Sequence, residues 1–347
     1  MSLLLVAGAG ASNDSRFAGA DDAQDHDAKP PLAKELFSAS YSGVLRPNRH
    51  LDGALLHMRR AVANREDIEE AMDRLQLDAE AGDQEREKQL LALRFWVHAV
   101  MGRVGSWAPS GLTNHFLLLD ILRSKQAIAG LDDVMVVTFN WDLLMERAIE
   151  SVYEHEIAGF EDYLSHDQIR LWKLHGSVDW SHPTSLVHAF PHPKHVYPLV
   201  IERPSEAIPL EDTFHFGGHY LVEWQQPQEG ESPGRVALPA LALPFKSKHW
   251  FECPSIHVDD LRLRLPGVDR VIVIGWAGGE RGFLDMLKSV KPEVPTMVVG
   301  NTEEGVRRTV AALGQGGLRN IRATRAGFSE AVKTHAFARF VDGEPIT

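Results

Sequence analysis

The sequence predicts an α/β fold in which a parallel β-sheet carries helices on both of its faces. Two observations support this prediction: short apolar segments recur along the chain, and segments with the apolar spacing of helices separate them. Near-continuous apolar strands are typical of parallel sheets buried on both faces, and the intervening helices provide the crossover connections. The predicted strands comprise residues 3–6, 134–139, 169–174, 270–274 and a segment that ends at Gly300.

Composition and charge narrow the class of protein. The chain has 347 residues, of which 44% are apolar, enough for one large domain or two ordinary ones. Its single cysteine, Cys253, excludes an internal disulfide framework and a zinc site built from paired C-x-x-C motifs. The net charge of −12 opposes direct binding of nucleic acid, because Lys and Arg supply most of that affinity. No apolar run reaches the ~20 residues of a membrane span, and no signal-peptide pattern is present, so we expect a cytoplasmic protein.

The chain divides into a sheet domain and two further regions. Residues 51–104 carry helix-forming residues with apolar spacing of three and four, which predicts a helical insert. Residues 181–248 are rich in proline, histidine and glycine and have little periodicity, which predicts an irregular small subdomain or lid. The Rossmann-like domain then comprises residues 1–50, 105–180 and 249–347.

Small and polar residues collect at the carboxyl ends of the predicted strands. Because these ends meet at one edge of a parallel sheet, the residues would face a common crevice, where ligands bind in such folds. In the first group, residues without bulk would admit a phosphate to the backbone N–H groups; the alternative is a tight strand-to-helix turn without a ligand. The five groups are Gly8-Ala9-Gly10-Ala11-Ser12, Thr138-Phe139-Asn140-Trp141-Asp142, His175-Gly176, Gly275-Trp276-Ala277 and Gly300-Asn301.

The ordered motifs at these strand ends resemble the sirtuin superfamily. They are GAGAS at 8–12, TFNWD at 138–142, KLHGSVDW at 173–180, VIVIGW at 271–276 and VVGN at 298–301. More narrowly, the chain is similar to the bacterial sirtuin-like domains of antiphage defence systems, whose members cleave NAD. The segments PPLAKELF from Pro30 and LPALALPFKSK from Leu238 also fit that branch. The resemblance extends from residue 3 to residue 301 and implies that the Rossmann-like domain binds NAD+ as a substrate.

Two features of protein-deacylating sirtuins are missing from the sequence. Their four-cysteine zinc ribbon cannot form from one cysteine, so we expect no zinc. Their Arg-containing loop of the type GIPDFR has only Asp14 and Arg16 as stand-ins. The histidines of residues 181–248 also match no metal-ligand spacing, and no metal site is predicted at His182, His188, His192 and His195.

The resemblance implies a role for each strand-end residue. Cleavage between nicotinamide and ribose develops oxocarbenium character, so the site needs a proton acceptor and a group that holds a ribose hydroxyl or water. His175 suits the first role because imidazole titrates near pH ~6.5, and the Asn140 amide suits the second because it accepts and donates at once. Asp142 would either orient the site electrostatically or act as a carboxylate at a helix N-terminus. The residues expected to bind NAD+ are Gly8, Ala9, Gly10, Ala11, Ser12, Thr138, Gly275, Trp276 and Asn301.

Other interpretations of these residues remain open. His175 could be a core histidine, and Asn140 could be a helix N-cap. We predict an enzyme that hydrolyses NAD+ to nicotinamide and ADP-ribose, as an antiphage effector that depletes NAD+. The alternatives are a protein deacylase or ADP-ribosyltransferase that uses the same site, and a non-catalytic sensor of NAD or ADP-ribose.

Assembly is the expected control of such an activity. The helices of residues 51–104 are long enough to present apolar faces to a second copy of the chain, and we expect a homo-oligomer. A separate ATPase, nuclease or Argonaute-type protein is a candidate partner. The sequence does not choose among these partners.

Overall fold

A parallel sheet forms the centre of the molecule, and among the described residues it has six strands in the order β10-β9-β8-β1-β2-β3. The computed structural model describes residues 1–15, 29–107, 112–188, 196–217, 221–222, 234–246 and 250–345. The strands are β1 (Ser2–Ala7), β2 (Asp133–Thr138), β3 (Ile169–Lys173), β8 (Arg270–Ile274), β9 (Thr296–Val299) and β10 (Ile321–Thr324). The predicted α/β fold with a parallel sheet is confirmed.

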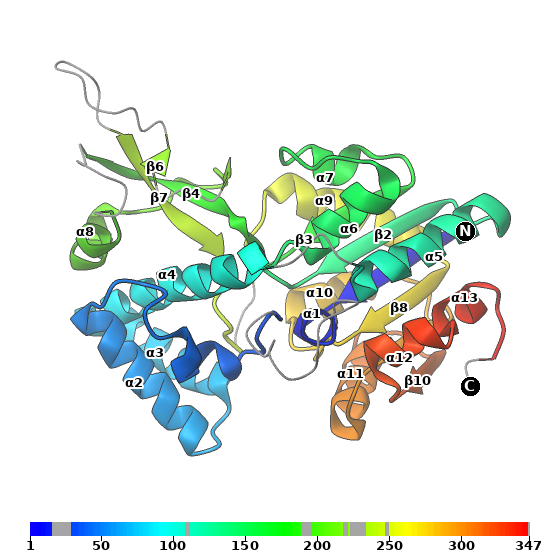
Figure 1. Cartoon of the computed structure of the whole chain (residues 1–347), viewed down its shortest axis with the longest axis horizontal. Coiled ribbons are helices and arrows are strands. Elements are labelled where there is room, and N and C mark those ends of the chain that lie inside the picture. Colours follow the sequence, from blue (N-terminus) through cyan, green and yellow to red (C-terminus); the bar gives the residue numbers. More distant parts are fainter. Residues whose placement is uncertain are drawn as a thin grey trace.

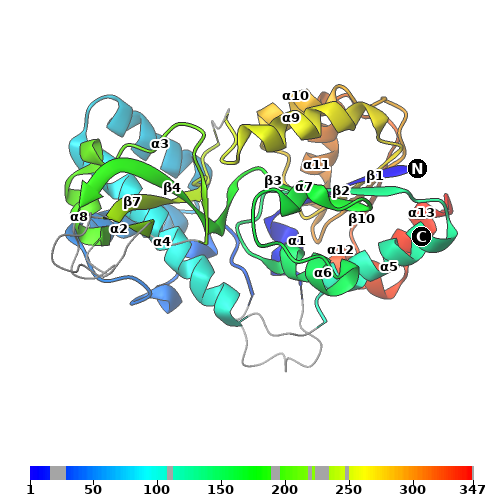
Figure 2. The ribbon, with the colours of Figure 1, turned by 90° about the horizontal axis from the view of Figure 1, so that it is seen from above.

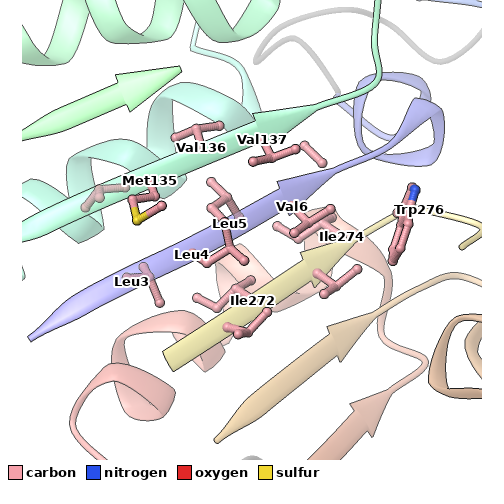
Figure 3. Close-up of a cluster of buried hydrophobic side chains, with 14 of the residues drawn as sticks. Leu3, Leu4, Leu5, Val6, Met135, Val136, Val137, Ile272, Ile274 and Trp276 are labelled. Carbon is pink, nitrogen blue, oxygen red and sulfur yellow. The ribbon is translucent and has the colours of Figure 1, made fainter. Parts of the chain in front are cut away.

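The core of this domain is built around β1, which lies between β2 and β8 (Figure 3). Leu3, Leu4, Leu5 and Val6 are all fully buried, because helices cover both faces of the sheet. Successive side chains of a strand point to opposite faces, so a strand buried on both faces needs an apolar residue at every position. This requirement explains the uninterrupted apolar run near the start of the sequence.

Helices cover both faces of the parallel sheet (Figure 2). On one face lie α9 (Ser255–Arg264), α10 (Arg281–Leu287) and α11 (Glu303–Gln315); on the other lie α5 (Asn114–Ile128), α6 (Leu144–Tyr153), α12 (Gly327–Lys333) and α13 (Ala336–Val341). The shorter elements of this domain are α1 (Ala9–Asn13), α7 (Asp162–Ser165) and the 3₁₀ turn η5 (Leu265–Gly267). Within the described ranges, no helix combines the length and apolarity that a bilayer crossing requires.

A second lobe stands beside the sheet domain (Figures 1 and 2). Its helices are α2 (Arg49–Ala63), α3 (Ile68–Glu80), α4 (Gln84–Trp107) and α8 (Val196–Glu202), with 3₁₀ turns η1 (Glu35–Phe37), η2 (Ala39–Tyr41) and η4 (Pro204–Glu206). Helices α2, α3 and α8 pack against α4, and α4 packs against an antiparallel sheet of order β5-β4-β7-β6. The strands of this sheet are β4 (Gly176–His188), β5 (His215–Phe216), β6 (Leu221–Val222) and β7 (Gly234–Leu241). Most buried side chains of this lobe form a core separate from that of the parallel sheet, whereas Trp180 of β4 and Ala240 of β7 belong to the core of the parallel sheet.

This antiparallel sheet lies where the sequence predicts an irregular subdomain, and the expectation of irregularity is wrong for its described part. Strand β4 also crosses the expected boundary at residue 180 without a break. The sequence does not predict these strands because Pro183 lies inside β4 and Pro239 inside β7, and proline within a segment argues against a strand. The register between β4 and β7 shifts on both sides of the Ser181–Pro183 segment, so the alternation of side chains is broken as well.

Candidate functional site

Two adjoining cavities lie along the carboxyl edge of the parallel sheet. The first has a volume of about 360 Å³ and lies between the two lobes, and the second has a volume of about 220 Å³ and lies over the ends of β8 and β9. The two cavities share the lining residues Gly10, Leu32, Gly275, Trp276, Ala277 and Arg308. Two adjoining cavities therefore lie where the sequence predicts a crevice.

Most of the strand-end residues singled out in the sequence line these cavities. The first cavity is lined by Gly8, Ala9, Gly10, Ser12, Asn140, Asp142, His175, Gly275 and Trp276, and the second by Gly10, Gly275, Trp276 and Asn301. Ala11 and Thr138 line neither. Thr138 instead donates its hydroxyl to the carbonyl of Ala7 at 3.1 Å and accepts the N–H of Asn140 at 3.1 Å. It joins two strand ends rather than facing a ligand.

The glycine-rich turn after β1 lies in close backbone contact with the turn after β8. The N–H of Gly10 donates to the carbonyl of Gly275 at 3.0 Å, and the N–H of Ala11 donates to the carbonyl of Gly8 at 2.9 Å. A Cβ on Gly8 would lie 2.5 Å from the carbonyl oxygen of Gly275, and a Cβ on Gly275 (φ +60°) would lie 2.3 Å from the nitrogen of Ala11. Gly8 and Gly275 therefore lack side chains because the turns after β1 and β8 touch. In the turn after β1, the N–H groups of Gly8, Gly10 and Ala11 already donate to backbone carbonyls.

Asn140 is held in the first cavity by one end of its amide. Its Nδ2 donates to the carbonyl of Gly8 at 3.0 Å and to the hydroxyl of Ser12 at 2.8 Å. The residue is 7% exposed, and its Oδ1 is buried without a hydrogen-bond partner in the described part of the chain. A buried amide oxygen normally has a partner, so the side chain presents an acceptor that a water or a ribose hydroxyl would satisfy.

His175 lies in the turn between β3 and β4, on the wall of the first cavity. The next residue, Gly176, has φ +79°, and a Cβ there would lie 2.0 Å from the carbonyl oxygen of Ala240, so the turn requires glycine after the histidine. The Nε2 of His175 lies 3.9 Å from a carboxylate oxygen of Glu280, whose other oxygen accepts the indole N–H of Trp276. A carboxylate at this distance would favour an imidazolium that forms during a reaction.

Aromatic rings form the apolar wall next to the histidine. Phe139 packs edge-on against His175 with ring centroids 4.9 Å apart and stacks on Trp276 at 5.6 Å. Trp276 is the second residue after β8 and lies beyond the end of that strand (Figure 3). The wall would pack against a planar leaving group and keep water away from it.

Asp142 lines the first cavity, but its contacts are those of a residue at a helix start. Its Oδ1 accepts the N–H of Leu144 at 3.0 Å, at the beginning of α6. Its carbonyl oxygen accepts a hydrogen bond from Nζ of Lys173 at 2.5 Å. Of the two roles open in the sequence, these contacts support the carboxylate at a helix N-terminus.

A buried ion pair between Lys173 and Glu146, which the sequence did not predict, lies beneath the site. Lys173 is fully buried, and its Nζ lies 2.6 Å from Oε1 of Glu146, which also accepts the hydroxyl of Tyr163 at 3.1 Å. Burial raises the pKa of Glu146 to about 7, and the positive charge of Lys173 opposes that rise. Because Lys173 also binds the carbonyl of Asp142, the pair fixes the loop that carries Asn140. A lysine at the end of a strand carries no sequence signal of such a pair, since its partner is 27 residues away.

Several expected residues have other roles or lie outside the described residues. Asp14 accepts the N–H groups of Phe328 at 2.6 Å and Ser329 at 3.2 Å, so it caps the start of α12. Arg16 lies outside the described residues. His182 pairs with Glu252 at 2.8 Å. The His188 side chain, His192 and His195 lie outside the described residues. Within the described ranges, no group of three His, Cys, Asp or Glu side chains could hold a metal ion.

Among known proteins, this chain is similar to solved structures of Sir2 homologues. No protein-family model matches the sequence, and no curated protein matches it. Among solved structures, a Sir2 homologue in complex with NAD is 14% identical, with a TM-score of 0.42 over 99% of this chain and 90% of that chain. A phenylalanine-to-alanine variant of a Sir2 homologue in complex with ADP-ribose is 14% identical, with a TM-score of 0.44. A serine-to-alanine variant in complex with ADP-ribose is 13% identical, with a TM-score of 0.40. Each match covers 99% of this chain and 92% of the other chain.

Proposed function

We propose that this protein hydrolyses NAD+ to nicotinamide and ADP-ribose in the first cavity. The supporting observation is that Asn140 and His175 both line this cavity and that the Oδ1 of Asn140 is buried without a partner among the described residues. A second cavity adjoins the first, which suits a ligand built from two linked nucleotides. The carboxyl edge of a parallel sheet is also where nucleotides bind in doubly wound folds.

The chemistry assigns one task to each of these two side chains. The bond between the ribose C1′ and the nicotinamide nitrogen breaks, and nicotinamide leaves with the bonding electrons as a neutral molecule. Oδ1 of Asn140 would accept a hydrogen bond from a ribose hydroxyl or from the attacking water and thereby hold it in place. The water oxygen bonds to C1′, and its proton passes to His175, from which it is released to solvent. The nearby carboxylate of Glu280 would stabilise the imidazolium.

The biological setting belongs to the same proposal. An NAD+ hydrolase of this kind would act in the cytoplasm as an effector of antiphage defence that depletes NAD+. Such an activity needs control, and we propose that assembly into a homo-oligomer, or binding of an ATPase, nuclease or Argonaute-type protein, switches it on. The first cavity lies between two lobes, so a partner that changes their relative position would open or close it.

The test is incubation of the purified protein with NAD+, alone and with candidate partners, followed by chromatography of the products. Size-exclusion chromatography with light scattering on the same samples would give the oligomeric state. We expect equal amounts of nicotinamide and ADP-ribose without any acylated peptide. Consumption of NAD+ only in step with peptide deacylation, or transfer of ADP-ribose to a protein, would support those enzymes instead. Recovery of unchanged NAD+ from the assembled protein would indicate a sensor.

A further inference from the structure

Arg308 occupies the place where the two cavities meet. The residue belongs to α11, is exposed and lines both cavities. Among the described residues that line the second cavity, it is the one with a charged side chain. In the part of the chain that the structure describes, its guanidinium forms no hydrogen bond or ion pair. An arginine at the junction of two cavities, with all five donors free, is suited to bind an anion that extends from one cavity into the other.

The neighbouring residue fixes the backbone of Arg308 at this junction. Thr309 is 4% exposed and donates its hydroxyl to the carbonyl of Trp276 at 2.5 Å. One turn further along α11, Ala312 packs so closely on the turn after β8 that a Cβ on Gly278 would lie 2.3 Å from its own Cβ. Helix α11 is therefore held against the glycine-rich turn, and the position of Arg308 does not depend on its own side-chain contacts.

Several other groups near this junction that could bind an anion already have partners or are negatively charged. The N–H groups of Gly10 and Ala11 donate to backbone carbonyls. Lys246, which lines the first cavity, forms an ion pair with Glu70. The start of α11 carries Glu303 in its first turn, which opposes an anion there. Arg308 would thus supply the positive charge that binds an anionic ligand.

We propose that Arg308 binds the diphosphate of a dinucleotide whose adenosine half occupies the second cavity and whose other half occupies the first. The planar guanidinium can donate two parallel hydrogen bonds to phosphate oxygens. This inference rests on the proposed use of NAD+, but it concerns binding, which can be measured without turnover. It assigns the diphosphate to a side chain, whereas the sequence motifs direct attention to the glycine-rich turn.

The test compares Arg308→Gln with Arg307→Gln, since Arg307 is the exposed neighbour on the same helix and lines neither cavity. Calorimetry would measure the affinity for ADP-ribose, which contains the diphosphate. Ligand-observed NMR would measure the affinity for adenosine, which lacks it. Arg308→Gln should weaken ADP-ribose binding by about ten- to a hundredfold, the value of a lost charged hydrogen bond, and leave adenosine binding unchanged. Arg307→Gln should change neither affinity.

Each result bears on one of the two proposals. Equal losses in the two variants, an Arg308→Gln protein with wild-type affinity for ADP-ribose, or a wild-type protein that does not bind ADP-ribose would overturn the role of Arg308. A parallel loss of adenosine binding would also overturn it, because it would indicate damage to the cavity. If the Arg308 results hold but the wild-type protein cleaves no NAD+, the diphosphate site stands and the proposed hydrolase fails.

Discussion

Comparison of Asn140→Ala with Ser12→Ala should separate the structural role of the Asn140 side chain from its chemical role. The Nδ2 end holds Gly8 and Ser12, whereas the Oδ1 end is free for a ligand. Asn140→Ala removes both ends. The matched control is Ser12→Ala, which removes the shorter of the two hydrogen bonds and leaves the Oδ1 of Asn140 and the bond to Gly8 in place.

The stability cost follows from the contacts. Asn140→Ala loses two buried hydrogen bonds, each with a net contribution of roughly 0.5–1.5 kcal/mol, so unfolding should become easier by about 1–3 kcal/mol. The carbonyl of Gly8 keeps the N–H of Ala11 as a donor, so no acceptor is stranded there. Ser12→Ala loses one of these bonds and should cost about 1 kcal/mol. Urea denaturation of both variants would measure the two values.

The two variants should differ far more in the rate of NAD+ cleavage than in stability. If Oδ1 positions water or a ribose hydroxyl, Asn140→Ala should lower the rate of NAD+ cleavage by at least ~10²-fold in a folded protein. Ser12→Ala should stay within about tenfold of the wild type, because one neutral hydrogen bond contributes no more than that. Similar losses of turnover in the two variants would refute the reasoning, since they would show that Asn140 acts by holding the turn.

Three further predictions address other parts of the site. His175→Ala should lower NAD+ cleavage by at least ~10²-fold in a protein that remains folded, and near-normal product formation in chromatography would remove this residue from the mechanism. Gly10→Val should destabilise the fold by about 1–3 kcal/mol in a thermal melt, because even a Cβ would lie 2.9 Å from Cα of Gly275; a wild-type melting temperature would contradict the close crossing. Burial raises the pKa of Glu146 from 4.5 to about 7, so the folded state holds the proton more tightly than the unfolded state. The stability contributed by this group is present below about pH 4.5 and is lost as the pH rises to about 7. Glu146→Gln should therefore reduce the change in the free energy of unfolding across that pH range, as measured by urea denaturation. An unchanged pH dependence of the unfolding free energy would exclude this carboxyl as the cause.

The fold was predictable because five of the six described strands of the parallel sheet carry their own signal, whereas the short edge strand β10 (IRAT) has no apolar run. The apolar run at Leu3–Val6 requires burial on both faces, whatever the rest of the chain does. The antiparallel sheet has no such signal: β4 and β7 contain Pro183 and Pro239 and shift register, so neither alternation nor a continuous run survives in the sequence. Its pairing depends on contacts between segments about 50 residues apart, which a local pattern does not contain.

The candidate site was predictable to the extent that it consists of strand ends. The rule that these ends meet at one edge brought Asn140, His175 and Asn301 to the same pair of cavities. It did not bring in Arg308, which sits in the second turn of α11 and reaches the site through the packing of that helix. Nor did it show that Lys173 points away from the cavity into a buried pair with Glu146, because both residues look like ordinary ends of their elements.

The glycine-rich turn is weaker support for a nucleotide than its sequence suggests. Gly8, Gly10 and Gly275 are all required by the contact between two turns, since a Cβ on any of them would lie 3.0 Å or closer to backbone atoms of the other turn. A chain with this crossing would need the same three glycines whether or not it bound a phosphate. The crossing by itself does not require that Oδ1 of Asn140 be buried without a partner among the described residues. Nor does it require an arginine where the two cavities join, with no hydrogen bond or ion pair to any described residue. The proposal of a dinucleotide substrate therefore depends on Asn140 and Arg308 more than on the motif that first drew attention to it.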